Sequence, residues 1–158
     1  MKNYKFDIII DTREKVGLWE FQSSKIGEIH RTKLDVGDYS IVGLEDILYI
    51  ERKRNPAEFY SNITEKRFYK EFERGKDYKY KYMILEFDSS DIYFFPHNSD
   101  IPKKIWPKLK ITPNYIFKQI SEIQVNYGVS IIFAGNQDTA SFMATNIMKR
   151  VYECERPS

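Results

Sequence analysis

The stretch from Leu34 to Phe59, LDVGDYSIVGLEDILYIERKRNPAEF, decides how the chain is expected to fold. Within it, the apolar run 47–50 predicts a short strand that continues directly into Glu51-Arg52-Lys53. Successive side chains of a strand point to opposite faces, so Glu51 and Lys53 share one face and Arg52 points to the other. The stretch therefore predicts an acid and an amine side by side at a sheet edge.

A second carboxylate precedes this strand, in the Gly37-Asp38 turn. If the segment after the turn pairs with the strand, Asp38 returns beside Glu51. Two carboxylates held so close repel each other, and a divalent cation is the usual remedy. The alternative is a plain turn followed by solvated charges. The apolar run before Glu51 and the turn residues at both ends favour an ordered site.

Gly37-Asp38 followed by Glu51-Arg52-Lys53 resembles the GD…ERKxxxD signature of the XPF-type nucleases. That family includes the Mus crossover-junction endonucleases and the archaeal Hef nuclease. The resemblance covers about the whole chain.

Other segments extend the resemblance beyond the signature. The runs 34–39 and 51–54 are especially similar to the Mus branch, the segment Asp11-Thr12-Arg13-Glu14 is similar to the family's opening acidic segment, and Arg67-Phe68 resembles its next block. These similarities are most specific between Asp11 and Glu86.

One position departs from the signature, because the family's last Asp falls on Ala57. Its contribution is then either missing or has passed to Glu58. The run Asn55-Pro56-Ala57-Glu58 also predicts a helix start, with Asn at the N-cap, Pro at the first position and Glu reaching back. Glu58 is therefore either a cap or a ligand.

The resemblance implies an α/β fold of the restriction-endonuclease-like, PD-(D/E)xK class, in which helices flank a mixed central sheet. The expected order of strands and helices is compatible with it. The strands are predicted at 6–10, 28–34, 80–87 and 129–133, besides the central segment. Further helices are predicted to start at Thr64, at Thr112 with Gly128 as the stop, and near Asp138.

The resemblance also implies a DNA endonuclease that depends on Mg2+, or on Mn2+, and cleaves branched, flap or junction DNA in repair and recombination. The expected metal ligands are Asp38, Glu51, the main-chain carbonyl of Arg52, Asp11 and Glu14. Lys53 orients or deprotonates the attacking water, so Asp38, Glu51 and Lys53 are the expected catalytic residues. The alternative for Asp11-Thr12, without the resemblance, is the start of a simple turn or cap.

Basic side chains concentrate in two segments that are candidates for phosphate contact. Residues 65–81 hold seven Lys or Arg against four Asp or Glu, and residues 103–110 hold four lysines and no acid. The helical face of the first segment is either solvated or in contact with DNA. Trp106 either stacks on a base or anchors its loop to the core. The expected DNA contacts are Arg13, Arg54, Arg67, Lys70, Arg74, Lys103, Lys104, Trp106 and Lys108.

Composition limits the remaining possibilities. The chain has 158 residues, a net charge of +2, one cysteine and two histidines far apart in sequence. A single cysteine cannot form an intramolecular disulfide. The cysteine and the histidines are not spaced like the ligands of a zinc site. No apolar stretch is long enough to cross a membrane. We expect one nuclease domain over residues 1–158, without the family's helix-hairpin-helix module, in the cytoplasm, or in the nucleus of a eukaryote.

Two other functions stay open, namely a sequence-specific restriction-like or nicking endonuclease and a cleavage-dead DNA-binding partner subunit. The apolar stripe Met143, Ile147 and Val151 on the last helix is either a homodimer seam or a cover for the sheet. The expected partners are thus branched DNA and a second copy of the chain.

Overall fold

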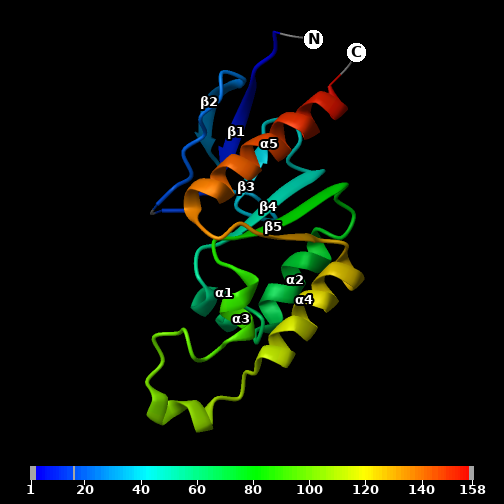
Figure 1. The fold of residues 1–158 in the computed structure, drawn as a ribbon. Helices are drawn as coiled ribbons and strands as arrows, with labels where there is room; N and C mark the ends of the chain where they lie inside the picture. Colours follow the sequence, from blue (N-terminus) through cyan, green and yellow to red (C-terminus); the bar gives the residue numbers. More distant parts are fainter. Residues whose placement is uncertain (1–2, 16, 157–158) are drawn as a thin grey trace.

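The computed structural model describes residues 3–15 and 17–156, which fold around a six-stranded mixed sheet (Figure 1). The strands are β1 (Phe6–Ile10), β2 (Ile26–Arg31), β3 (Tyr39–Ile41), β4 (Leu48–Lys53), β5 (Tyr80–Leu85) and β6 (Ser130–Phe133). They lie in the order β2-β1-β3-β4-β5-β6, with β3 antiparallel to both of its neighbours and the other pairs parallel. The expected mixed sheet is confirmed.

Helices cover both faces of this sheet (Figure 1). One face carries α1 (Pro56–Asn62), α2 (Lys66–Arg74), α3 (Ser89–Tyr93) and α4 (Pro113–Tyr127), and the other face carries α5 (Gln137–Glu155). In the described part of the chain, none of the helices combines the length and apolarity needed to span a bilayer.

The strand β4 divides its side chains between two hydrophobic cores. Tyr49 packs with Phe59 in the core beneath α1, α2 and α4. Leu48 and Ile50 pack with Met148 in the core beneath α5. The same alternation continues to the end of the strand, so it decides which face receives each charged side chain of the signature.

Capping side chains fix the helices that frame the site. The Asn55 side chain accepts a hydrogen bond from Glu58 N at 2.9 Å, and Thr112 caps α4 in the same way. Gly128 ends α4 with a φ of 66°, a conformation that favours glycine. Each side-chain cap contributes about 1 kcal/mol. These three boundaries agree with the sequence prediction.

Several predicted boundaries are wrong: β2 ends at Arg31 instead of residue 34, β5 ends at Leu85 instead of residue 87, and β6 begins at Ser130 instead of residue 129. Thr64 does not open α2, because its hydroxyl donates to Ser61 O at 2.8 Å at the end of α1, and Glu65 is the N-cap. β2 begins at Ile26 instead of residue 28, because its parallel partner β1 begins opposite, at Phe6. The partner strand sets that boundary, and the alternation of the sequence alone does not contain it.

The long segment between β5 and α4 contains α3 and the 3-10 helix η1 (Lys103–Lys108). Trp106 Nε1 donates to Ile101 O at 2.9 Å, and its ring meets His97 edge to face at 4.7 Å between centroids. Trp106 thus anchors the segment to itself rather than to either core.

The stripe on α5 covers the sheet. Val151 is buried in the core beneath α5, and Met143 and Ile147 pack against the same core. Of the two interpretations of this stripe, the structure supports the intramolecular one.

Candidate active site

The pairing of β3 with β4 brings Asp38 beside Glu51. Asp38 N donates to Ile50 O at 2.9 Å, and Asp38 Oδ2 accepts from Arg52 N at 2.8 Å. Gly37 has a φ of 79°, and a Cβ there would lie 2.9 Å from a side-chain atom of β4, so glycine is required. Backbone bonds therefore hold the Asp38 carboxylate in place.

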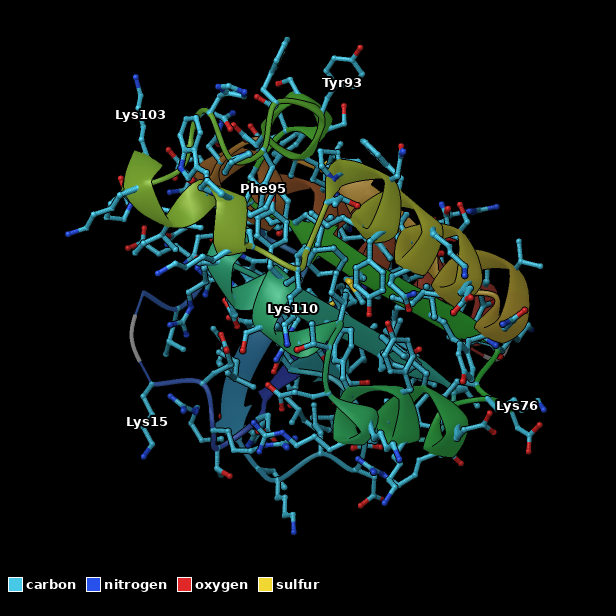
Figure 2. The ribbon with its side chains drawn as sticks, turned by 90° about the horizontal axis from the view of Figure 1, so that it is seen from below. Lys15, Lys76, Tyr93, Phe95, Lys103 and Lys110 are labelled. Atoms are coloured by element: carbon cyan, nitrogen blue, oxygen red, sulfur yellow. The ribbon has the colours of Figure 1, made fainter. Side chains whose placement is uncertain are left out.

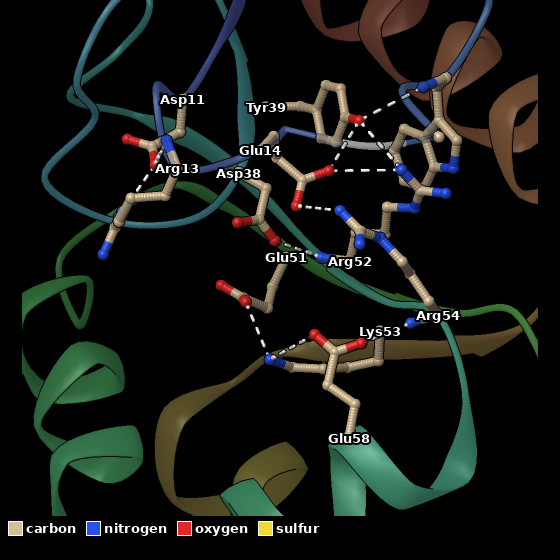
Figure 3. A network of polar contacts seen from close by, with 12 residues as sticks. Asp11, Arg13, Glu14, Asp38, Tyr39, Glu51, Arg52, Lys53, Arg54 and Glu58 are labelled. Atoms are coloured by element: carbon tan, nitrogen blue, oxygen red, sulfur yellow. Dashed lines mark hydrogen bonds and ion pairs between the residues drawn. The ribbon is translucent and has the colours of Figure 1, made fainter.

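Glu51 and Lys53 share one face of β4, as the alternation predicts. Lys53 Nζ lies 3.2 Å from Glu51 Oε1, 3.9 Å from Glu58 Oε1 and 5.0 Å from the centre of the Phe68 ring. Glu51 and Lys53 are both buried. Figure 3 shows the carboxylates of Asp38 and Glu51 close together, with the amine of Lys53 below Glu51.

Burial and mutual repulsion perturb this group. Burial raises the pKa of Asp38 to about 6, and the charge of Glu14 adds to the rise. Burial, followed by repulsion from Asp38, raises the pKa of Glu51 well above its usual range. Burial acts to lower the pKa of Lys53, but the charges of Glu51 and Asp38 outweigh it and the pKa is raised. The site thus holds a cationic lysine and two buried carboxylates that repel each other. The oxygen atoms of the carboxylates fit a hard divalent cation.

The opposite face of β4 holds Arg52, whose side chain is 1% exposed and fully partnered. Its Nε and Nη2 donate to the two carboxylate oxygens of Glu86 at 2.8 and 3.1 Å. Its Nη1 donates to Glu14 at 3.3 Å and to the Tyr39 hydroxyl at 3.4 Å, and its guanidinium lies 5.2 Å from the centre of the Trp19 ring. The Arg52 side chain is thus a structural centre, separate from the carbonyl that was expected to bind metal.

Asp11 and Glu14 flank the site in different ways. Asp11 Oδ1 accepts from Leu34 N at 2.8 Å, and its Oδ2 accepts from Arg13 N at 3.0 Å and from Arg13 Nε at 2.6 Å. Burial acts to raise the pKa of Asp11, but these hydrogen bonds lower it overall. Glu14 binds Arg52 and also Arg54, whose Nη2 lies 3.3 Å away (Figure 3). Asp11 therefore holds a turn, and Glu14 stands between the two faces.

Ala57, which stands where the family signature has its last Asp, lies in the first turn of α1. Ala57 is exposed and contributes no polar atom. The Glu58 carboxylate accepts a hydrogen bond from Arg54 N at 3.0 Å, just before the start of α1, and it also lies near Lys53. Glu58 therefore stabilises the start of the helix and is a neighbour of the site.

The cations expected to contact DNA are exposed to different extents. Arg13 and Arg54 stand at the rim of the site, with side chains 59% and 37% exposed. On α2, Arg67 is bonded to Glu65, and Arg74 Nη2 donates to Asp35 O at 3.2 Å. Lys70 is exposed on the same helix.

The lysines of the long segment do not form one group with the site. Lys103, Lys104 and Lys108 are exposed on η1. In Figure 2, Lys103 lies at the outer end of the segment, whereas Lys110 lies over α1. The structure therefore separates the expected cations into a rim, a helix and an outlying loop.

Two acidic residues that the sequence did not single out lie one on each face of β4. Glu71 on α2 accepts from Gly37 N at 2.8 Å, and its charge contributes to the raised pKa of Glu51. Glu86, directly after β5, binds Arg52 and accepts from Trp19 Nε1 at 2.6 Å. An available signal for Glu71 was its position between the buried Phe68 and Phe72; Glu86 follows a buried strand, as Glu51 does.

A separate group of possible metal ligands lies on the outer strands. His30 Nε2 lies 3.4 Å from Asp7 Oδ2 and 3.6 Å from Glu28 Oε2, and the three side chains have the spacing of a metal site. They come from β1 and β2, so the spacing of histidines along the chain could not reveal them. Their exposed position is distinct from the acid–lysine face of β4.

Comparison with known proteins agrees with the fold and the signature. The sequence model of the ERCC4 domain matches residues 10–145. The structure is similar to XPF from Aeropyrum pernix, with a TM-score of 0.67 and 15% identity over 95% of this chain and 66% of that one. A structure of the same protein in complex with DNA gives 0.65 and 16% over 98% and 68%. The chain thus spans about two thirds of the length of these structures. No curated protein sequence matches it.

Proposed function

Because this chain belongs to the ERCC4 domain family, the XPF-type nucleases, we propose that it is a metal-dependent DNA endonuclease that hydrolyses phosphodiester bonds. The observation that carries the proposal is the face of β4 on which two carboxylates and a lysine meet. Lys53 Nζ stands 3.2 Å from Glu51, and Asp38 is held beside Glu51 by the backbone of β4. This arrangement would hold a divalent cation on its carboxylates and position a phosphate, with its attacking water, beside Lys53.

Mg2+ is the proposed cofactor, and Mn2+ is an acceptable substitute because both prefer oxygen ligands. Asp38, Glu51 and the carbonyl of Arg52 would hold it, with Asp11 and Glu14 in outer positions. When bound, the cation stabilises the negative charge that develops on the phosphoryl oxygens.

Lys53 orients the attacking water. Its raised pKa keeps the amine protonated in the metal-free site, so it acts there as a hydrogen-bond donor and a positive charge. Glu51 accepts from it and fixes the direction of the amine. Removal of Lys53 should therefore slow cleavage without preventing metal binding.

The proposed substrate is branched DNA, such as flaps, forks or junctions. Support comes from family membership and from the related XPF, whose structure has been determined in complex with DNA. The competing proposals are a restriction-like or nicking enzyme on linear DNA and a cleavage-dead binding subunit. The presence of Asp38, Glu51 and Lys53 together argues against the last of these.

One experiment separates these proposals. Labelled flap, fork and four-way junction DNA, and linear duplexes of random sequence, are incubated with the protein in Mg2+, Mn2+ or chelator. We expect cleavage of branched DNA with either cation and none with chelator. Equal cleavage of the linear duplexes would reject selectivity for structure, and binding without cleavage in both cations would reject the nuclease.

A homodimer is a further proposal, but the α5 stripe no longer supports it, because that stripe covers the sheet. A second copy would have to dock on another surface. Sedimentation of the unmodified chain, with and without branched DNA, decides the question, and a monomer in both conditions would reject the dimer.

A further inference from the structure

A pocket of about 810 Å³ lies between α1 and the segment that precedes α4. Its wall is mainly apolar, with Tyr60, Phe95, Ile101, Leu109 and Ile111 as the larger side chains. Tyr60 and Phe95 meet edge to face, with 4.6 Å between ring centres. In Figure 2, Phe95 points into the protein between the segment and α1. The volume is within the range of small-ligand sites.

The hydroxyl group of Tyr60 has no partner in this pocket. The residue is 6% exposed, and its hydroxyl is buried without a hydrogen bond among the described residues. Leaving a buried hydroxyl unpaired costs about 1–3 kcal/mol. Burial, with a contribution from Asp91, raises the pKa of Tyr60 to about 12, so the group stays protonated at neutral pH. Tyr60, one of the lining residues, therefore carries an unpaired donor.

The pocket is lined in part by the short segment that leads from β4 into α1. Its lining includes Asn55, Pro56 and Ala57, which follow Lys53 within four residues, and the next residue, Glu58, lies 3.9 Å from Lys53. A strand of DNA that had its phosphate at Lys53 and continued along the start of α1 would bring its neighbouring nucleotides to the pocket.

Charged side chains of both signs line the pocket. Asp91 is half-buried in the lining, so it disfavours an anionic group beside it, whereas Asp100 is exposed. Lys108 and Lys110 also line the pocket and are exposed, so they can meet phosphates outside it. An occupant with a neutral planar part and a flanking anion satisfies both conditions.

We propose that this pocket receives one unpaired nucleobase of the DNA strand beside the scissile phosphate, with the base against Tyr60 and Phe95 and its phosphate at Lys108 and Lys110. A base supplies a π-face for the aromatic side chains and an acceptor for the Tyr60 hydroxyl. The base must be unpaired, because a base within a duplex cannot enter a pocket. The pocket would select for branched DNA by this means. The inference rests on the proposed function, because it places the substrate strand along β4.

Binding in chelator tests the pocket independently of cleavage. Fork DNA is prepared with a single abasic site at each unpaired position in turn, and its affinity is measured by fluorescence anisotropy. One position near the branch should weaken binding by about fivefold or more when its base is missing. A uniform response along the strand would overturn the proposal.

The Tyr60→Phe variant tests the hydroxyl without changing the ring. Its binding to intact fork DNA should weaken about two- to tenfold, and the penalty for the abasic site should shrink accordingly. The matched control is Tyr49→Phe, because Tyr49 also has a buried and unpartnered hydroxyl but lies in the core, outside the pocket. Equal effects of the two variants would overturn the assignment of Tyr60.

A blocking variant complements these measurements. Ala57→Trp places a large side chain at an exposed position of the lining, and Ser90→Trp places the same side chain on α3 outside it. Only the first should abolish the dependence on the base, with circular dichroism as the check of folding. A selective abasic effect together with no cleavage in Mg2+ would retain the pocket and reject the nuclease. Cleavage of branched DNA with no abasic effect would do the reverse.

Discussion

Each face of β4 carries a basic side chain among carboxylates, but the charges are compensated on one face and not on the other. On the α5 side, Arg52 satisfies Glu86 with two hydrogen bonds and reaches Glu14 and Tyr39 as well. On the α1 side, the single positive charge of Lys53 faces the carboxylates of Glu51, Asp38 and Glu58 and cannot compensate all of them.

This difference separates a structural network from a candidate catalytic one. A buried ion network that is fully partnered holds the fold in one arrangement, and removing one member leaves charges without compensation. Carboxylates whose pKa values are raised by burial and by each other store an unfavourable interaction, which a cation can relieve. Mutations on the α5 side should therefore lower the stability of the fold, whereas mutations on the α1 side should lower the activity.

The largest expected effect is on cleavage by the α1-side face. Asp38→Asn or Glu51→Gln should reduce the rate of branched-DNA cleavage to below about one thousandth of wild type, because a ligand charge is lost. Binding in chelator should be retained, since it depends on dispersed phosphate contacts. Single-turnover cleavage and anisotropy measure the two quantities. Wild-type cleavage by both variants would reject the proposed site.

The next effect should appear in the stability of the α5-side face. Arg52→Met leaves Glu86 and Glu14 buried without their main cation, at an expected cost of about 3–5 kcal/mol in the free energy of unfolding. Arg54→Met is the matched control, because it removes a half-exposed arginine from the same Glu14 and should cost less than about 1 kcal/mol. Urea unfolding in chelator gives both values. Similar losses for the two variants would contradict the structural role of Arg52.

A third prediction concerns the sign of the pH dependence of stability. The folded-state pKa of Asp38 is about 6, above its ordinary value, so this group destabilises the protein increasingly as the pH rises from about 4 to about 6. Asp38→Asn should therefore stabilise the metal-free protein by about 1–3 kcal/mol at pH 7.5, and less at pH 4.

Asp11 provides the opposite case, because its folded-state pKa is lowered. Its contribution to stability is present above the ordinary carboxyl pKa and is lost as the pH falls through the folded-state value. Asp11→Asn should thus destabilise the protein at pH 7.5. Urea unfolding of both variants at several pH values checks the pair, and effects of the same sign at pH 7.5 would break the comparison.

Sequence alone predicted the part of the site that depends on local rules. The alternation of β4 placed Glu51 with Lys53 and separated Arg52, and the Gly37 turn indicated the return of Asp38. Asn55, Thr112 and Gly128 fixed helix boundaries for the same reason, because a cap acts within a few residues.

Contacts between distant elements could not be predicted in this way. The partners of Arg52 depend on which strand follows β4 in the sheet, and the approach of Glu71 depends on how α2 docks. The grouping of His30 with Asp7 depends on the parallel register of β1 and β2. Each requires the tertiary arrangement, which periodicity within one element does not contain.

The smallest expected effect concerns the surface that must bring DNA to an acidic site. If the cations of α2 contact phosphates, their combined replacement should lower the slope of log K against log salt by up to about three counterions. The test variant is the triple alanine substitution of Arg67, Lys70 and Arg74. The control is the triple alanine substitution of Lys5, Lys149 and Arg150, of which the last two lie on α5, on the opposite face of the sheet. Anisotropy titrations of fork DNA in chelator, at several salt concentrations, give the slopes. A decrease confined to the first variant would place DNA along α2, beside the carboxylates of β4. An unchanged slope would mean that these cations are only solvated, and the grip on DNA would then have to come from Lys103, Lys104, Lys108 and Lys110.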